Sequence, residues 1–138
     1  MLIVLGKIIP IFEERLRSLG GWLRTNGQAI YGSTYWSSQN DTRPGNQVWY
    51  TQSKDKETLF AITLLWPRNG IVLRLNDVVA TNKTQIYLLG YPKDPLDYAQ
   101  YDDYLLVKFP PLHSFIRECG DYCRWAYTLK ITHFHKKG

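Results

Sequence analysis

The sequence predicts a mainly β protein, an antiparallel β-sandwich preceded by one N-terminal α-helix. Two observations support this prediction: apolar residues recur at helical spacing before position 27, and short runs of alternating β-branched and aromatic residues follow. A chain of 138 residues with 44% hydrophobic content is long and apolar enough for one folded domain. No window reaches the run of about 18 apolar residues that a transmembrane helix needs.

The predicted helix begins at Pro10, where the missing N–H of proline costs nothing in a first helical turn. Apolar residues then recur at steps of four, three and four along one face: Phe12, Leu16, Leu19 and Leu23. Gly20 and Gly21 each weaken a helix by about 1 kcal/mol relative to alanine, so we expect a kink or break there. The pair Asn26 and Gly27 ends the helix. Before it, MLIVL lacks the basic flank and cleavage site of a signal peptide and is interpreted as a strand remnant.

After the helix the apolar period changes to two. Seven runs are predicted as strands, at residues 28–31, 48–51, 58–66, 71–75, 85–89, 104–109 and 125–132. Turn signals separate them, including Pro44-Gly45 and Pro110-Pro111. Antiparallel strands can be joined by such short connections, whereas a parallel sheet requires crossover helices, so the spacing favours a sandwich.

Charge and cysteine content limit the function classes. The net charge of +5 comes from lysines and arginines scattered along the chain, whereas nucleic-acid binding needs them on one face, so we expect no nucleic-acid or membrane partner. Cys119 and Cys123 in CGDYC are predicted to be structural cysteines, and a disulfide between them is expected only in an oxidising compartment. The histidines supply no matching ligand pair, so we expect no metal and no cofactor.

Several segments resemble the junction between barrel and C-terminal domain in the α-L-fucosidases of glycoside hydrolase family 29. They are the ERL helix, the hinge WLRTNGQAIY, the strand VWYT and the turn LLWP followed by NG, within about residues 6 to 132. The resemblance implies that residues 1–27 are a remnant of the end of the catalytic barrel, namely a strand remnant plus its last helix. It implies that residues 28–138 are the C-terminal β-sandwich, and that the chain is a fragment or an alternative product.

The resemblance also implies a function for the parent enzyme. Family 29 enzymes hydrolyse α-L-fucosides of glycoproteins and glycolipids with retention, using two carboxylic residues that lie on barrel strands upstream of this chain. No catalytic residue is therefore assigned here, and we expect no hydrolysis by the chain alone. The parent family is lysosomal or secreted and reaches fucosylated glycans through its barrel; a homo-oligomer is left open. The alternatives are a carbohydrate-binding module and a partner-docking module that uses the apolar face of the helix.

Candidate site residues follow from local motifs. Two N-x-T sequons, at Asn40 and Asn82, lie in predicted turns and are candidate N-glycosylation sites. Tyr35 and Trp36 are candidate sugar contacts, although the aromatic residues as a group are predicted mainly to form the core. The adjacent acids of Glu13-Glu14 and Asp102-Asp103 point apart on a helix or strand, so neither pair converges on one substrate atom. The aspartates between residues 94 and 103 are interpreted as a solvated turn rather than a calcium loop.

Overall fold

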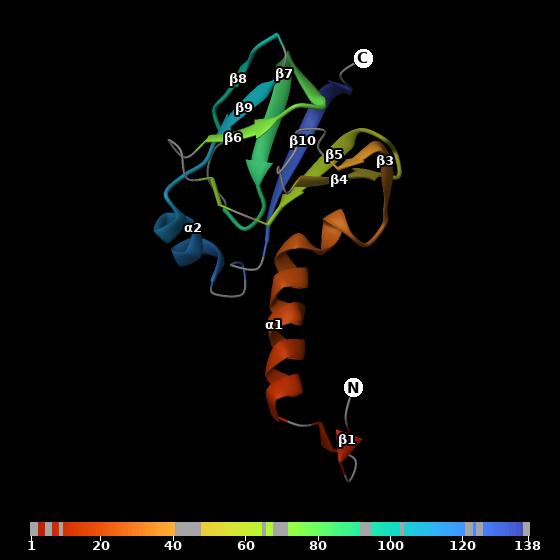
Figure 1. Cartoon of the computed structure of the whole chain (residues 1–138), viewed down its shortest axis with the longest axis vertical. Coiled ribbons are helices and arrows are strands. Elements are labelled where there is room, and N and C mark those ends of the chain that lie inside the picture. The colour runs from red at the N-terminus through yellow and green to blue at the C-terminus, as the bar shows by residue number, and fades with distance from the viewer. Residues whose placement is uncertain are drawn as a thin grey trace.

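The structure is a computed structural model that describes residues 3–4, 7–8, 10–40, 48–64, 66–67, 72–91, 95–102, 104–120, 123 and 126–136, and only the backbone of residues 3–15, 35 and 37–40 among them. A β-rich body carries α1 (Pro10–Asn26), which projects away from it, and β1 (Ile3–Val4) lies beyond the far end of this helix (Figure 1). Among the described residues, β1 pairs with β2 (Lys7–Ile8) alone. One end of α1 is therefore attached to the body and the other is not.

Two antiparallel sheets form the body. The first has the strand order β3-β4-β5-β10-β7 and the second the order β6-β9-β8. The strands are β3 (Ser33–Asn40), β4 (Val48–Ser53), β5 (Thr58–Thr63), β6 (Val72–Leu75), β7 (Val78–Leu88), β8 (Tyr98–Gln100), β9 (Leu105–Lys108) and β10 (Tyr127–Lys136). A short helix, α2 (Leu112–Cys119), connects β9 to β10. The predicted fold class is confirmed: the chain is mainly β, with antiparallel sheets preceded by an N-terminal helix.

The core lies between the two sheets and is built from alternate strand residues. Its fully buried side chains include Leu59, Leu75, Ile86, Leu105, Leu129 and Ile131. β10 pairs with β5 on one side and with β7 on the other, so it is an inner strand of the five-stranded sheet. Each such side chain contributes about 1.5–3 kcal/mol when it is removed from water. The alternation of Leu129 and Ile131 toward the core agrees with the face predicted from the sequence.

α1 runs without a break from Pro10 to Asn26, so the break expected at Gly20 and Gly21 is wrong. Glycine lowers helix stability but does not force a break, and the last turns of α1 are held by contacts with the body. A β-carbon built at Gly20 meets nothing within 4 Å, so this position lies on the open side of the helix. None of the helices in the described part of the chain is long and apolar enough to cross a membrane.

Several predicted strand bounds differ from the structure. Residues 27–29 form a 3-10 turn, η1 (Gly27–Ala29), where residues 28–31 were expected to be extended, because the N–H groups of Ile30 and Tyr31 both donate to Gly27 O. β3 then occupies residues 33–40, part of which was expected to be a turn. β7 begins at Val78, well before the predicted position 85, and β8 and α2 were not predicted.

Candidate functional site

The last turns of α1 are fixed on the sandwich. Trp22 is 9% exposed, and its Nε1 donates a hydrogen bond to Ala126 O at 3.0 Å. Directly after the helix, Ala29 of η1 packs with Phe60 and Leu89 in a second, smaller core. The neighbours of Phe60 in β5, residues 59 and 61, belong to the main core, so Phe60 points to the opposite face of the sheet. η1 therefore covers part of the outer face of the five-stranded sheet, directly after the anchored end of α1.

A disulfide lies against the same turn of α1. Cys119 and Cys123 are bonded, with their Cα atoms 6.1 Å apart. Thr25 Oγ1 lies 3.7 Å from the Cys119 sulfur and 3.9 Å from the Cys123 sulfur. A β-carbon at Gly90, where φ is +87°, would come within 2.4 Å of Cys119 Sγ. Glycine is required here by both conformation and space, and α1, the turn after β7 and the end of α2 meet at this point.

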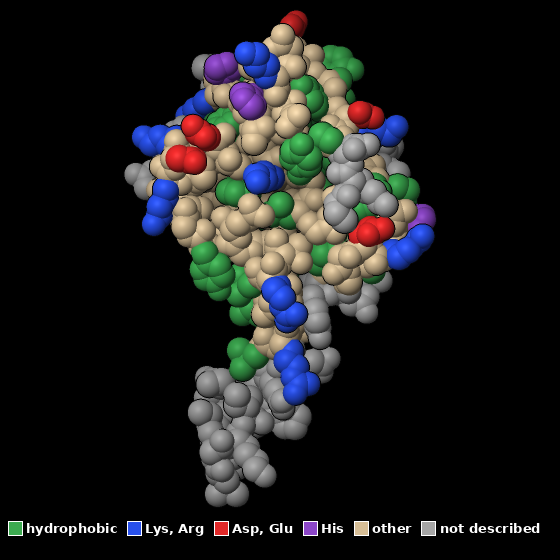
Figure 2. Space-filling model, turned by 180° about the vertical axis from the view of Figure 1, so that it is seen from behind, with side chains coloured by type: hydrophobic (Ala, Val, Ile, Leu, Met, Phe, Trp, Pro, Cys, Tyr) green, Lys and Arg blue, Asp and Glu red, His purple; other side chains and the backbone are tan. Residues whose placement is uncertain are grey.

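Exposed apolar side chains gather beside α1. Seven large hydrophobic residues are exposed in the described part of the chain, and five of these lie on α1, on the turn after η1 or on β4: Leu16, Leu19, Ile30, Tyr31 and Trp49. We call these five residues the junction surface. Figure 2 shows hydrophobic side chains on the projecting helix and on the adjoining end of the body. Large exposed apolar patches on a protein surface are typical of interaction sites.

A shallow groove of about 380 Å³ connects two parts of the junction surface, Ile30 and Trp49. Ser33 and Thr51 line it, and both of their hydroxyl groups donate to Ala29 O, at 2.9 and 2.8 Å. These hydroxyl hydrogens hold η1 in place, so the exposed side chains of Ile30 and Trp49 are the main contacts that the groove offers to a ligand or to another surface.

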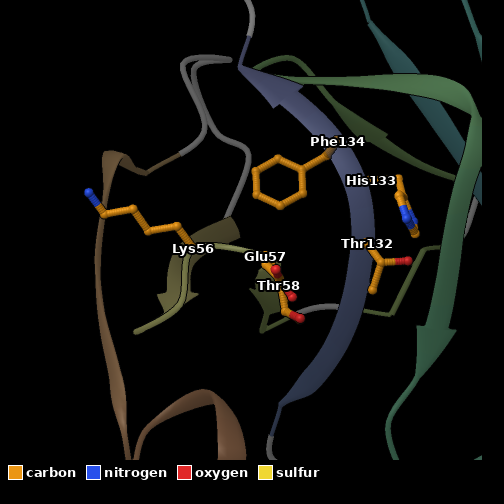
Figure 3. Close-up of a pocket in the computed structure, with 6 residues that line it drawn as sticks. All are labelled: Lys56, Glu57, Thr58, Thr132, His133 and Phe134. Carbon is orange, nitrogen blue, oxygen red and sulfur yellow. The ribbon is translucent and has the colours of Figure 1, made fainter.

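A second hollow, of about 390 Å³, lies where β10 runs past the start of β5. Its lining residues are Lys56, Glu57, Thr58, Thr132, His133 and Phe134. Figure 3 shows the Phe134 ring on the side of β10 that faces the β4–β5 hairpin, whereas Thr132 and His133 lie on the other side of the strand. Because these side chains point to opposite sides of β10, they do not converge on one ligand atom.

Among the carboxylates, Asp55 has a structural role at the β4–β5 turn. Its Oδ1 accepts hydrogen bonds from Ser53 Oγ at 2.5 Å and from Glu57 N at 3.0 Å, and these bonds hold the pKa of the Asp55 carboxyl below its ordinary value of 3.8. Asp102 is exposed, and the side chains of Glu13, Glu14 and Asp103 lie outside the described residues. Among the described residues, no group of three or more His, Cys, Asp and Glu side chains is placed to hold a metal ion.

The two predicted sugar contacts and the two sequons are placed differently. Trp36 is 5% exposed, and its ring lies 5.1 Å from Tyr50 and 6.1 Å from Phe134, so the expectation that it faces a sugar is corrected: it is a core residue. The side chains of Tyr35 and Asn40 lie outside the described residues. Asn82 is exposed and lies within β7 rather than in the predicted turn.

The residues that fix α1 were not singled out from the sequence. Trp22 lies in the predicted helix, and its position next to the apolar face was the one available signal of a contact with the body. Thr25 and Gly90 carry no such signal, because their neighbours are far away in the sequence. Leu16 and Leu19 were expected to need a partner surface, and the structure leaves both exposed.

Two antiparallel sheets and a helix anchored at one end define this protein as a β-sandwich domain with a projecting N-terminal helix. The family described as "Alpha-L-fucosidase C-terminal domain" matches residues 39–132, and the chain belongs to this family. The resemblance to the C-terminal portion of the family 29 α-L-fucosidases is thereby confirmed.

Similar proteins agree with this assignment. The chain is 37% identical over 129 residues to the plasma α-L-fucosidase of Rattus norvegicus, covering 93% of this chain and 27% of that protein. It is 37% identical over 127 residues to the tissue α-L-fucosidase of Homo sapiens, covering 92% and 26%. A crystal structure of Thermotoga maritima α-fucosidase with a mechanism-based inhibitor has a TM-score of 0.70 at 22% identity, covering 93% of this chain and 28% of that one, and shows the same fold. The chain thus spans about a quarter of the length of these relatives.

Proposed function

We propose that this chain is the accessory C-terminal β-sandwich of an α-L-fucosidase, that it packs against the catalytic barrel, and that it does not hydrolyse fucosides alone. The junction surface is the observation that carries the proposal. Leu16 and Leu19 are 46% and 42% exposed, and covering a leucine fully contributes about 1.5–3 kcal/mol, so an adjoining barrel would gain stability by burying them. In this proposal residues 1–27 belong to the end of the barrel and residues 28–138 to the sandwich.

The reaction belongs to the parent enzyme in this proposal. Hydrolysis of an α-L-fucoside with retention needs two carboxyl groups about 5–5.5 Å apart, one as nucleophile and one as acid and base. We assign both to the barrel. The described carboxylates offer little for this chemistry: Asp55 is engaged in a turn, and Glu57 is exposed on the same hairpin. The substrates of the parent are α-L-fucosides of glycoproteins and glycolipids.

The proposed location is lysosomal or secreted. The bond between Cys119 and Cys123 supports it, because disulfides persist in oxidising compartments. The chain would meet fucosylated glycans through the parent enzyme, either as a single copy or in a homo-oligomer.

A chimera tests the proposal. The C-terminal quarter of the rat plasma α-L-fucosidase is replaced by this chain, and hydrolysis of a chromogenic α-L-fucoside and the melting temperature are measured. We expect the chimera to be active and the isolated chain to be inactive. Changing both Leu16 and Leu19 to glutamate places charges in the proposed interface, so we expect lower activity and a lower melting temperature. Leu64→Glu is the matched control, because Leu64 is 44% exposed but lies outside the junction surface.

Two results would contradict the proposal. One is turnover by the isolated chain that disappears when Glu57 is changed to glutamine. The other is an equal loss of activity and melting temperature in the Leu64 control and in the Leu16 and Leu19 variant, which would show that α1 is not part of the interface.

Glycan binding is the second candidate function, and the exposed ring of Trp49 in its groove is the observation that favours it. Flat aromatic rings stack on the apolar faces of sugars, and Trp49 is 38% exposed. Titration of the isolated chain with fucosylated oligosaccharides should then give heat of binding that Trp49→Ala abolishes. The absence of binding at millimolar oligosaccharide would leave the groove as part of the barrel interface alone.

A further inference from the structure

Residues 81–84 form a bulge in β7, at the edge of the five-stranded sheet. Thr132 of β10 pairs with Gln85, but Phe134 pairs with Ala80, so the intervening residues of β7 face only His133. Asn82 and Lys83 are exposed at this bulge. Bulges interrupt the pairing of a strand and turn its residues outward, which places the Asn82 amide in solvent although it lies within a strand.

Hydroxyl groups hold the bulge in one shape. Thr84 Oγ1 donates to His133 O and accepts a hydrogen bond from Thr81 N at 2.8 Å. The Tyr98 hydroxyl lies 2.9 Å from Thr81 O and 3.0 Å from Thr84 O. Thr84 is only 5% exposed. The first and third residues of the Asn82-Lys83-Thr84 sequon therefore differ in the folded chain: the amide of Asn82 is accessible to solvent, and the hydroxyl of Thr84 is not.

We infer that Asn82 is an N-glycosylation site, and that its glycan is added before β7 pairs with β10. The inference rests on the secretory location included in the proposed function. In the transfer, the Asn82 amide nitrogen forms a bond to the anomeric carbon of the first sugar of a lipid-linked oligosaccharide. The bond from that carbon to the lipid diphosphate breaks, the diphosphate leaves with the bonding electrons, and the amide proton passes to a base of the transferring enzyme.

The order of events follows from Thr84. The acceptor motif includes its hydroxyl, so an enzyme that recognises the motif needs this group free. In the folded chain the hydroxyl is buried and bonded to His133 of β10. Since β10 is the last strand of the described chain, the sequon is synthesised and exposed before its partner strand exists.

The position of the site is compatible with the proposed interface. In Figure 1, β7 begins at the end of the sandwich away from α1 and runs toward it. A glycan on the first half of β7 thus leaves the junction surface free. The outward edge of β7 is already bonded to the following chain, since Leu96 N donates to Ile86 O at 2.7 Å and Ala80 N donates to Gln100 Oε1 at 2.8 Å. A glycan here adds a steric barrier to strand pairing at a sheet edge.

The site is tested on the whole chain, expressed in mammalian cells behind a cleavable secretion leader, so that the result does not depend on the natural route. The secreted protein is treated with peptide-N-glycosidase F. Asn40→Gln removes the other sequon, and we expect this variant to lose the mass of one glycan. The variant with both Asn40→Gln and Asn82→Gln is the matched control and should not change. A secreted Asn40→Gln variant without a releasable glycan overturns the site, while the activity of the fucosidase chimera would be unaffected.

The order of events is tested with protein made in bacteria. The folded Asn40→Gln chain and the same chain carrying Leu129→Asp, which places a carboxylate at a fully buried core position, are incubated with microsomal transferase and a lipid-linked donor. Circular dichroism verifies that only the second chain is unfolded. We expect the unfolded chain to be glycosylated at least tenfold more than the folded one. Equal modification of both, or modification of neither, overturns the inferred order.

Discussion

Replacing Trp22 with phenylalanine tests whether the last turns of α1 are fixed on the sandwich. The change removes the Nε1 donor that meets Ala126 O at 3.0 Å in a buried site. A net hydrogen bond contributes about 1 kcal/mol, and a buried carbonyl left unpaired costs about 1–3 kcal/mol. The smaller ring also leaves a gap at a position that is 9% exposed, which costs about 1 kcal/mol more. We therefore expect Trp22→Phe to lower the free energy of unfolding by about 2–3 kcal/mol.

Urea unfolding followed by circular dichroism measures this change, and amide hydrogen exchange along α1 shows where it acts. Leu19→Ala is the control, because Leu19 lies on the same helix but is 42% exposed, and we expect it to change stability by no more than about 0.5 kcal/mol. Equal losses in the two variants would show that α1 is not held through Trp22. The same conclusion would follow if Trp22→Phe changed stability by less than about 0.5 kcal/mol and left exchange in α1 unchanged.

Three further predictions concern single side chains. Gly90→Ala should destabilise the chain by about 2 kcal/mol or more, because φ is +87° and the new methyl group would meet Cys119 Sγ at 2.4 Å. Gly20→Ala should stabilise α1 by about 1 kcal/mol, because nothing lies within 4 Å of the new methyl group. Urea unfolding of the two variants measures both changes. Thr128 is fully buried, and its Oγ1 has no hydrogen-bond partner among the described residues, so Thr128→Val should raise the unfolding free energy by about 1 kcal/mol; a loss would reveal a bound water or another partner. The Asp55 carboxyl should titrate by NMR below 3.8, and Ser53→Ala should raise that midpoint. Because the pKa of Asp55 is lower in the folded state, its stabilising contribution is present above the unfolded pKa and is lost as pH falls through the folded pKa. An unchanged midpoint in Ser53→Ala would remove this hydrogen bond as the cause.

The helix could be predicted from the sequence because its ends depend on local chemistry. Proline at the first turn and the Asn-Gly pair at the end act within a few residues, and α1 has the predicted bounds. Its continuity through Gly20 and Gly21 could not be predicted in this way. The contact that holds the last turns joins Trp22 to Ala126, and two residues so distant in the sequence give no local signal.

The strands were predictable where they are buried and alternate, and not where they lie at an edge. Residues 78 to 80 of β7 pair with β10, and the polar residues Thr81 to Lys83 that follow lie in the bulge between the two paired parts of this strand. α2 was missed because it has only eight residues, of which Phe115 alone is buried. Short helices and edge strands derive their stability from tertiary contacts rather than from local propensity.

The candidate site shows the same limit at the level of single residues. Trp36 and Trp49 lie on neighbouring strands and look alike in the sequence, but Trp36 is a core residue and Trp49 is exposed. Side chains alternate between the two faces of a sheet, so the register of each strand decides whether its tryptophan ring meets solvent. A shift of both strands by one residue would expose Trp36 and bury Trp49. The sequence could therefore predict that aromatic residues alternate in and out, but not which one lines the groove.

The fixed end of α1 would lower the entropic cost of docking the exposed apolar side chains of the same helix. A helix that is free to swing would lose conformational freedom on docking, and that loss would offset part of the gain from burying Leu16 and Leu19. Trp22 and the contacts around Thr25 set the direction of α1 before docking, so less freedom remains to be lost. The anchoring residues would thereby strengthen the proposed interface without touching the partner. For this reason the junction surface is better suited to binding a second folded domain than the groove beside Trp49 or the hollow beside Phe134.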